Sequence, residues 1–113
     1  MLKDLIIFQK AYELLKWLHQ VTAKFPKSEK FVLAQKMENT ALDFLEAVIE
    51  GNESVDKTVP LKKAVLALEK IRIWLRLSFE LRYIAIKQYE YGSKMADEAG
   101  RLLGGWNKRF GRL

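Results

Sequence analysis

The amino-acid sequence predicts an all-α protein, an antiparallel up-down-up-down four-helix bundle that forms one domain over residues 1–113. Three observations support this prediction. Apolar residues recur at helical spacing in four segments, the segments have similar lengths, and the connections between them are short. Half of the 113 residues are hydrophobic, which is enough for the domain to form its own hydrophobic core. We find no segment with the alternation of a β-strand.

The first two helices are predicted at about residues 2–23 and 28–50. Phe25-Pro26 separates them, because proline disfavours a helical conformation in the residue before it. Ser28 is expected to cap the second helix and Gly51-Asn52 to end it. Each helix has one apolar face, formed by Ile7, Ala11, Leu14, Leu15, Leu18 and Val21 in the first and by Leu33, Ala34, Met37, Ala41, Phe44, Leu45 and Val48 in the second.

The third and fourth helices are predicted at about residues 60–83 and 86–106. Pro60 suits the first turn of a helix. One uninterrupted helix from there to Tyr91 would be about 48 Å long, far longer than its neighbours, so we expect a turn near residues 83–86. Gly104-Gly105 is expected to weaken the fourth helix, which leaves residues 107–113 as a basic tail. The apolar face of this helix contains Met95, Ala99, Leu102 and Trp106.

The third helix differs from the others because it has two apolar stripes. Leu61, Ala64, Leu68, Ile71, Leu75 and Phe79 form the first stripe, which suits a bundle core. The second stripe lies more than a quarter of a turn away and consists of Leu66, Ile73, Trp74, Leu77 and Leu81. A chain this short does not easily enclose a helix on all sides. The second stripe therefore predicts a surface that buries against another copy of the protein or against a protein partner.

The charge is concentrated in the second half of the chain. Residues 1–56 hold seven lysines and nine acidic residues, whereas residues 57–113 hold thirteen basic and five acidic residues, which gives +6 overall. All six arginines lie in the second half, and the arginine side chain can bond two phosphate oxygens at once. This distribution predicts a polyanionic partner such as nucleic acid.

Two interpretations of the basic residues stay open. Arg101, Lys108, Arg109 and Arg112 have no acid near them in sequence after Glu98 and are candidates for phosphate contact. Lys63 and Lys70 could rim a subunit interface or face an anion. Alternatively, the charges form ion pairs on the helix surface, because Glu69 precedes Arg72 by three residues and Glu80 follows Arg76 by four.

Residues for catalysis or metal binding are nearly absent from the sequence. The only histidine, His19, has no acid at a catalytic or metal-like spacing, and Asp43, Glu46 and Glu50 lack the Glu-x-x-His pattern of carboxylate-bridged metal sites. There is no cysteine, no phosphate-binding glycine loop and no apolar run that approaches the roughly 18 residues of a membrane span. Met1–Leu5 lacks the features of a signal peptide. We expect a cytoplasmic, non-enzymatic protein without catalytic residues, metal, cofactor, small-molecule substrate or membrane partner.

Three groups of residues together resemble one protein family. The first group is Phe25–Phe31, Leu33, Glu38-Asn39 and Ala41-Leu42-Asp43. The second is Arg76-Leu77, Glu80-Leu81 and Lys87–Glu90, and the third is Glu98–Trp106. Their order and spacing, over about residues 10–108, resemble the Avd proteins, the accessory variability determinants of diversity-generating retroelements. The wider family includes four-helix-bundle proteins encoded in intervening sequences of 23S ribosomal RNA genes.

The resemblance implies a four-helix bundle that assembles as a homopentameric barrel. It also implies a non-enzymatic protein that binds RNA or DNA together with the element's reverse transcriptase. In that role the protein supports mutagenic retrohoming, in which an RNA template is copied with errors at adenines to diversify a target gene. Carried onto this sequence, the resemblance adds Arg72, Arg76, Arg82, Lys87 and Arg101 as contacts to phosphate or polymerase. The alternative is a structural or protein-interaction module of the ribosomal-RNA-linked type, without a polymerase partner.

Overall fold

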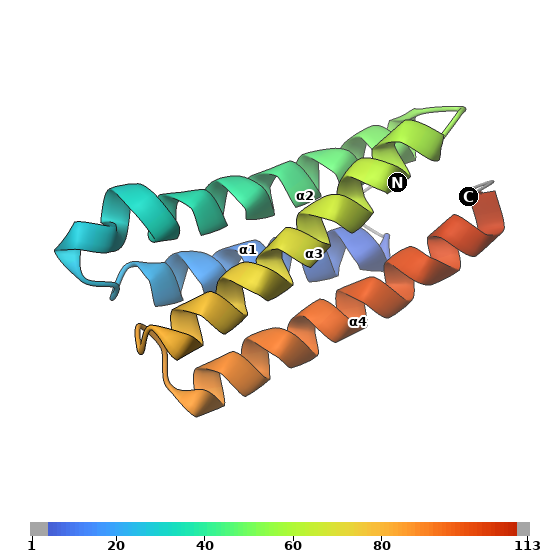
Figure 1. The fold of residues 1–113 in the computed structure, drawn as a ribbon. Helices are drawn as coiled ribbons and strands as arrows, with labels where there is room; N and C mark the ends of the chain where they lie inside the picture. The colour runs from blue at the N-terminus through green and yellow to red at the C-terminus, as the bar shows by residue number, and fades with distance from the viewer. Residues whose placement is uncertain (1–4, 111–113) are drawn as a thin grey trace.

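The computed structural model describes residues 5–110, and in this part of the chain all regular structure is helical. Four α-helices follow one another as α1 (Ile6–Thr22), α2 (Gln35–Glu53), α3 (Thr58–Glu80) and α4 (Ile86–Phe110). Each helix runs antiparallel to the one before it, and α4 returns beside α1 to close the bundle (Figure 1). This arrangement is the predicted up-down-up-down four-helix bundle.

The core is formed by the apolar helix faces expected from the sequence. Leu14 and Leu18 of α1, Phe44 of α2 and Ile71 and Leu75 of α3 have at most 1% of their surface exposed. The first stripe of α3 is buried as predicted, except that its last member, Phe79, is half-buried and stacks on Tyr89 with 5.0 Å between ring centroids. Leu15 and Leu45 lie at the core edge and are also half-buried.

Two glycines make room for tryptophan rings between the helices. Gly51 of α2 lies against Trp106 of α4, where an added Cβ atom would be 2.8 Å from Cη2 of the ring. Gly92 of α4 lies against Trp17 of α1 in the same way, and an added Cβ would be 2.6 Å from Cη2. The prediction that Gly51-Asn52 ends the second helix is therefore wrong, because α2 continues to Glu53 and uses Gly51 for packing.

The second helix also begins differently from the prediction. A 3₁₀ turn over Lys27–Glu29 and a π-helical turn over Lys30–Ala34 precede α2. Ser28 lies inside the 3₁₀ turn, whose N-cap is Pro26, and no side chain caps the turn with a hydrogen bond. The predicted cap at Ser28 is thus wrong.

The remaining helix boundaries agree with the sequence to within a few residues. Leu5 is the N-cap of α1, and residues 2–4 of the predicted helix lie outside the described residues. Pro60 lies in the first turn of α3 as predicted, but α3 ends at Glu80. Arg82 follows with a φ of 66°, a left-handed backbone conformation that reverses the chain before α4.

The C-terminal part of α4 continues past the predicted end. Gly104 and Gly105 are helical, and the helix extends through Lys108 and Arg109 to Phe110. These basic residues therefore belong to the helix and not to a tail, while residues 111–113 of the predicted tail lie outside the described residues. None of the helices in residues 5–110 combines the length and apolar character needed to cross a membrane.

Candidate interface and nucleic-acid surface

The second apolar stripe of α3 lies on the surface of the bundle. Leu66 and Ile73 are 56% and 57% exposed, and Leu77 and Leu81 are 37% and 47% exposed. These four side chains are not covered by the rest of the described chain, so the stripe is available to another molecule. We refer to Leu66, Ile73, Leu77 and Leu81 as the outer stripe.

Trp74, the fifth predicted member of the stripe, is placed differently. It is half-buried and packs against the core, and its indole Nε1 donates a hydrogen bond of 3.3 Å to the hydroxyl of Thr40 on α2. The hydroxyl of Thr40 donates in turn to the carbonyl oxygen of Lys36 at 2.7 Å. Trp74 thus joins α3 to α2 and borders the outer stripe.

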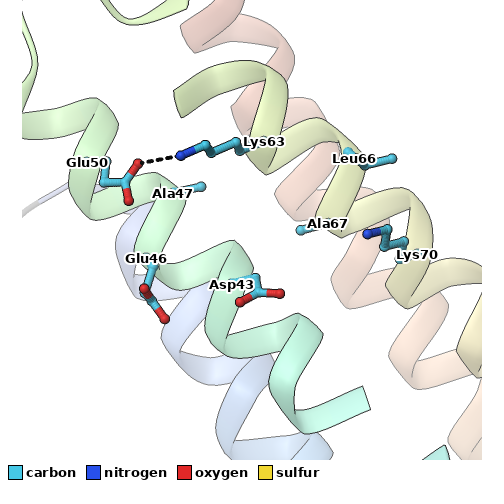
Figure 2. A pocket seen from close by; sticks show the side chains of 8 residues that line it. All are labelled: Asp43, Glu46, Ala47, Glu50, Lys63, Leu66, Ala67 and Lys70. Carbon is cyan, nitrogen blue, oxygen red and sulfur yellow. Dashed lines mark hydrogen bonds and ion pairs between the residues drawn. The ribbon is translucent and has the colours of Figure 1, made fainter. Parts of the chain in front are cut away.

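A groove of about 260 Å³ runs beside the outer stripe between α2 and α3. Its α2 side carries the acidic row Asp43, Glu46 and Glu50, and its α3 side carries Lys63 and Lys70 (Figure 2). Lys63 reaches across the groove, with its Nζ atom 3.5 Å from Oε2 of Glu50. The acidic row offsets the two lysines, so the groove is a poor phosphate site. No group of three or more potential ligands in the described chain could hold a metal ion, the acidic row included.

Arg72 connects α3 to α4. Its guanidinium donates a hydrogen bond to the carboxylate of Asp97 and another, of 3.2 Å, to the carbonyl oxygen of Ala96. On its own helix, Nε of Arg72 lies 3.6 Å from Glu69. Gly100 leaves room for this arrangement, because a Cβ atom there would be 2.8 Å from Nη2 of Arg72. The contacts within the chain make Arg72 a weaker candidate for phosphate binding than a cation without such partners.

Arg76 is also paired within the chain. Its Nε atom donates a hydrogen bond of 3.0 Å to Oε2 of Glu80, one turn further along α3. The hydrogen bond and the negative charge of Glu80 raise the pKa of Arg76. Both ion pairs expected from the spacing on this helix, Arg72 with Glu69 and Arg76 with Glu80, are present in the structure.

The other predicted phosphate contacts are exposed and lie along α4 and the turn before it. Four of them, Arg82, Lys87, Arg101 and Lys108, have no carboxylate partner among residues 5–110, and Arg109 is exposed near Lys108. Lys87 lies in the first turn of α4 and Lys108 in its last turn, about 30 Å apart at 1.5 Å per residue. This separation suits an extended polyanion and does not suit a small anionic ligand.

The lysines of the α1–α2 turn were not among the phosphate contacts predicted from the sequence. Lys24, Lys27 and Lys30 are exposed around the 3₁₀ turn, and the next residue, Phe31, is 85% exposed. The regular spacing of three residues between these lysines was the available signal. It lay in the half of the chain whose net charge is negative, where we did not expect a basic surface.

These features define a class of small helical-bundle protein with an uncovered apolar stripe and a row of exposed cations along its last helix. The chain belongs to the bAvd-like family, whose family model matches residues 5–110. This match confirms the resemblance noted in the sequence and supports an Avd-type accessory protein. A comparison with curated proteins found no match.

Proposed function

We propose that this Avd-type accessory protein assembles through the outer stripe into a pentameric ring that binds nucleic acid and a reverse transcriptase. The ring holds template RNA, complementary DNA and polymerase in one particle and so supports mutagenic retrohoming. The protein makes and breaks no covalent bonds in this process, and it acts in the cytoplasm.

The outer stripe supports self-assembly. Four aliphatic side chains in a row along one helix are uncovered, and patches of this kind usually mark an interface. A closed ring would bury the stripe of every copy, as symmetric oligomers generally do. The number of five comes from the family and gives a particle of five 13.2 kDa chains.

The basic surface along α4 is the observation that carries the nucleic-acid part of the proposal. Its exposed cations extend over about 30 Å, so one strand could contact several of them. Five copies of a chain with net charge +6 carry a formal charge of +30. Such a ring attracts RNA or DNA by phosphate neutralisation and counterion release, without reading the base sequence.

The proposed contacts fall into two groups. Arg82, Lys87, Arg101, Lys108 and Arg109 form the main phosphate or polymerase surface. Lys63, Lys70, Arg72 and Arg76 contribute less, because the first two border the acidic row of α2 and the other two are paired within the chain.

Light scattering tests the proposal directly. The mass of the particle is measured with and without a structured RNA at about 50 mM salt, where electrostatic binding is strong. We expect about five times 13.2 kDa for the protein alone and a larger particle with RNA. RNA uptake should decline steeply as the salt concentration rises. A monomer that does not take up RNA would contradict both parts of the proposal.

The ion pairs on α3 favour a second candidate, a protein-interaction module without nucleic acid. In that case the outer stripe binds a foreign protein, and the basic residues serve ion pairs such as Arg72 with Asp97 and Arg76 with Glu80. Uptake of RNA by the assembled protein distinguishes the two candidates, because the interaction module would not bind it.

A further inference from the structure

We propose that the end of the bundle formed by the α1–α2 and α3–α4 turns is a binding site for single-stranded nucleic acid, with Phe31 as a stacking platform for a base. This inference rests on the nucleic-acid binding proposed above. It assigns a site to Lys24, Lys27, Lys30 and Phe31, which lie outside the α4 surface, together with Arg82 and Lys87 at the near end of that surface. We call this set the turn-end site.

The two turns lie at the same end of the molecule (Figure 1). The Phe25 ring before the 3₁₀ turn packs against Tyr83 of the α3–α4 turn, with 5.4 Å between ring centroids. Glu29 of the 3₁₀ turn also faces Tyr83. Burial raises the pKa of the Tyr83 phenol, and the negative charge of Glu29 raises it further. The cations of both turns therefore belong to one surface.

Phe31 extends into solvent from an unusual backbone. It lies in the π-helical turn Lys30–Ala34, in which Leu33 and Ala34 are buried while Phe31 is 85% and Val32 62% exposed. π-Helical turns are rare and occur frequently at functional sites. An isolated exposed apolar residue is ordinary, but an almost fully exposed aromatic ring next to a row of lysines is not explained by packing.

The charges around Phe31 are those that a nucleic-acid strand requires. Five exposed cations lie in or next to the two turns: Lys24, Lys27 and Lys30 at the α1–α2 turn, and Arg82 and Lys87 at the α3–α4 turn. Among the described acids of the turns, Glu29 is half-buried beside Tyr83, and Glu80 is paired with Arg76. Glu38, which lines a pocket with Lys30 and Phe31, is paired with His19, and Glu90 is exposed one turn after Lys87. The five cations of the turn-end site therefore outnumber the unpaired acids near them.

The combination of lysines and an exposed ring favours a single strand. Cations bind the phosphates of single and double strands alike, but an aromatic side chain can stack only on a base that is unstacked from its neighbours. Such stacking tolerates any base, so the site would hold a template or a newly made strand without sequence preference.

The test compares an unstructured single-stranded RNA of about 16 nucleotides with an RNA duplex of the same length, by fluorescence anisotropy on the full chain. Phe31→Leu retains apolar character but removes the ring, and it should weaken single-strand binding by roughly tenfold while leaving duplex binding unchanged. Phe31→Trp should retain wild-type affinity. Val55→Ala, at a fully exposed apolar residue of the α2–α3 connection, is the control.

The lysines are tested by their effect on salt dependence. Replacing Lys24, Lys27 and Lys30 by Gln should reduce the slope of log affinity against log salt by about 2, because each phosphate contact on a single strand contributes about 0.7. Replacing the exposed Lys16 of α1 and Lys62 of α3 by Gln removes two charges from other faces and should change the slope much less.

The outcomes separate this inference from the proposed function. If the wild-type protein binds neither RNA, both fail. If it binds RNA and all turn-end variants bind equally well, only the turn-end site is wrong. Loss of binding in Phe31→Ala with full retention in Phe31→Leu would show an apolar contact and overturn the stacking role. Phe31-dependent binding to anionic lipid vesicles, with RNA binding independent of Phe31, would also overturn it.

Discussion

The Trp106 ring on α4 lies against the backbone of Gly51 on α2, across the diagonal of the bundle. An added Cβ atom at Gly51 would be 2.8 Å from Cη2 of the ring, and both residues are buried. Glycine is a poor helix former, yet here its missing side chain is what allows the ring to enter. The contact therefore explains why α2 contains a glycine without ending at it.

Gly51→Ala should lower the free energy of unfolding by about 1 kcal/mol or more. Alanine favours the helix by about 0.5–1 kcal/mol, but the new methyl group forces the buried Trp106 ring to move, and such overpacking costs about 1–3 kcal/mol. Urea denaturation followed by circular dichroism measures the change.

Gly104→Ala is the matched control for that experiment. Gly104 is helical and exposed, and an added Cβ would meet no atom within 4 Å. The same substitution should here raise stability by about 0.5–1 kcal/mol. Equal effects at both glycines would contradict the packing role of Gly51.

Arg82→Gly should stabilise the protein and weaken its binding to RNA. Arg82 has a φ of 66°, a conformation that costs a non-glycine residue about 1 kcal/mol, and glycine removes this cost. The same change removes an exposed cation of the turn-end site. Thermal unfolding and RNA titration on one sample measure the two effects.

Arg82→Lys is the control because it keeps both the charge and the backbone cost. It should leave the stability and the RNA affinity close to those of the wild type. A less stable Arg82→Gly protein would show that the Arg82 side chain makes a stabilising contact that the structure does not contain.

Arg72→Gln should mainly affect stability. Its guanidinium joins α3 to α4 through Asp97 and the carbonyl of Ala96, and about one third of the side chain is exposed. Partly exposed ion pairs contribute up to about 1 kcal/mol, so a loss of that size is expected. RNA affinity should fall less than in Arg101→Gln, which removes a cation without a carboxylate partner among the described residues. The reverse order would make Arg72 a phosphate contact.

Ile73→Glu and Leu77→Glu should each dissociate the assembly and leave the monomer folded. Both side chains are exposed on the bundle, so a carboxylate costs the monomer little, whereas an assembled interface would have to bury an unpaired charge. Light scattering should give the mass of a single chain. Val55→Glu, at a residue that is fully exposed on the α2–α3 connection, should leave the assembly intact.

Asp56 should contribute stability that depends on pH. Its Oδ1 atom accepts a 3.0 Å hydrogen bond from the backbone N–H of Thr58 at the start of α3, which lowers the pKa of Asp56 below its ordinary value of 3.8. Because the folded state favours the carboxylate, this stability is present above pH 3.8 and is lost as the pH falls through the lower folded-state pKa.

The measurement is the difference in unfolding free energy between the wild type and Asp56→Ala, from about pH 7 to about pH 2. The wild type should be the more stable protein at neutral pH, and the difference should shrink in acid. A difference that is constant with pH would contradict the role of the charged side chain.

The helix faces could be predicted because each follows from local spacing. Leu14, Phe44 and Ile71 are buried where a period of 3.6 residues puts them, and the outer stripe was visible as a second set of apolar residues at the same period. The glycines were misinterpreted for the opposite reason. Whether a glycine ends a helix or packs against an aromatic ring depends on a partner such as Trp106, which is 55 positions from Gly51 in the sequence.

The candidate site was only partly predictable for a similar reason. The Arg76–Glu80 pair lies within one helical turn and could be expected, but Asp97, which binds Arg72, is 25 residues away on another helix. The exposure of Phe31 depends on the π-helical turn, for which the sequence has no recognised signal. The sequence therefore identified the basic residues, but it did not show which of them are already paired with acids within the chain.

The placement of the three tryptophans makes the protein suitable for fluorescence spectroscopy. Trp17 lies against Gly92 between α1 and α4, Trp74 is bonded to Thr40 between α3 and α2, and Trp106 reaches Gly51 from α4. In variants that retain a single tryptophan, the fluorescence of that residue would report on the one helix contact in which it lies. Comparing their unfolding curves would reveal whether the four helices separate together or whether one pair opens first.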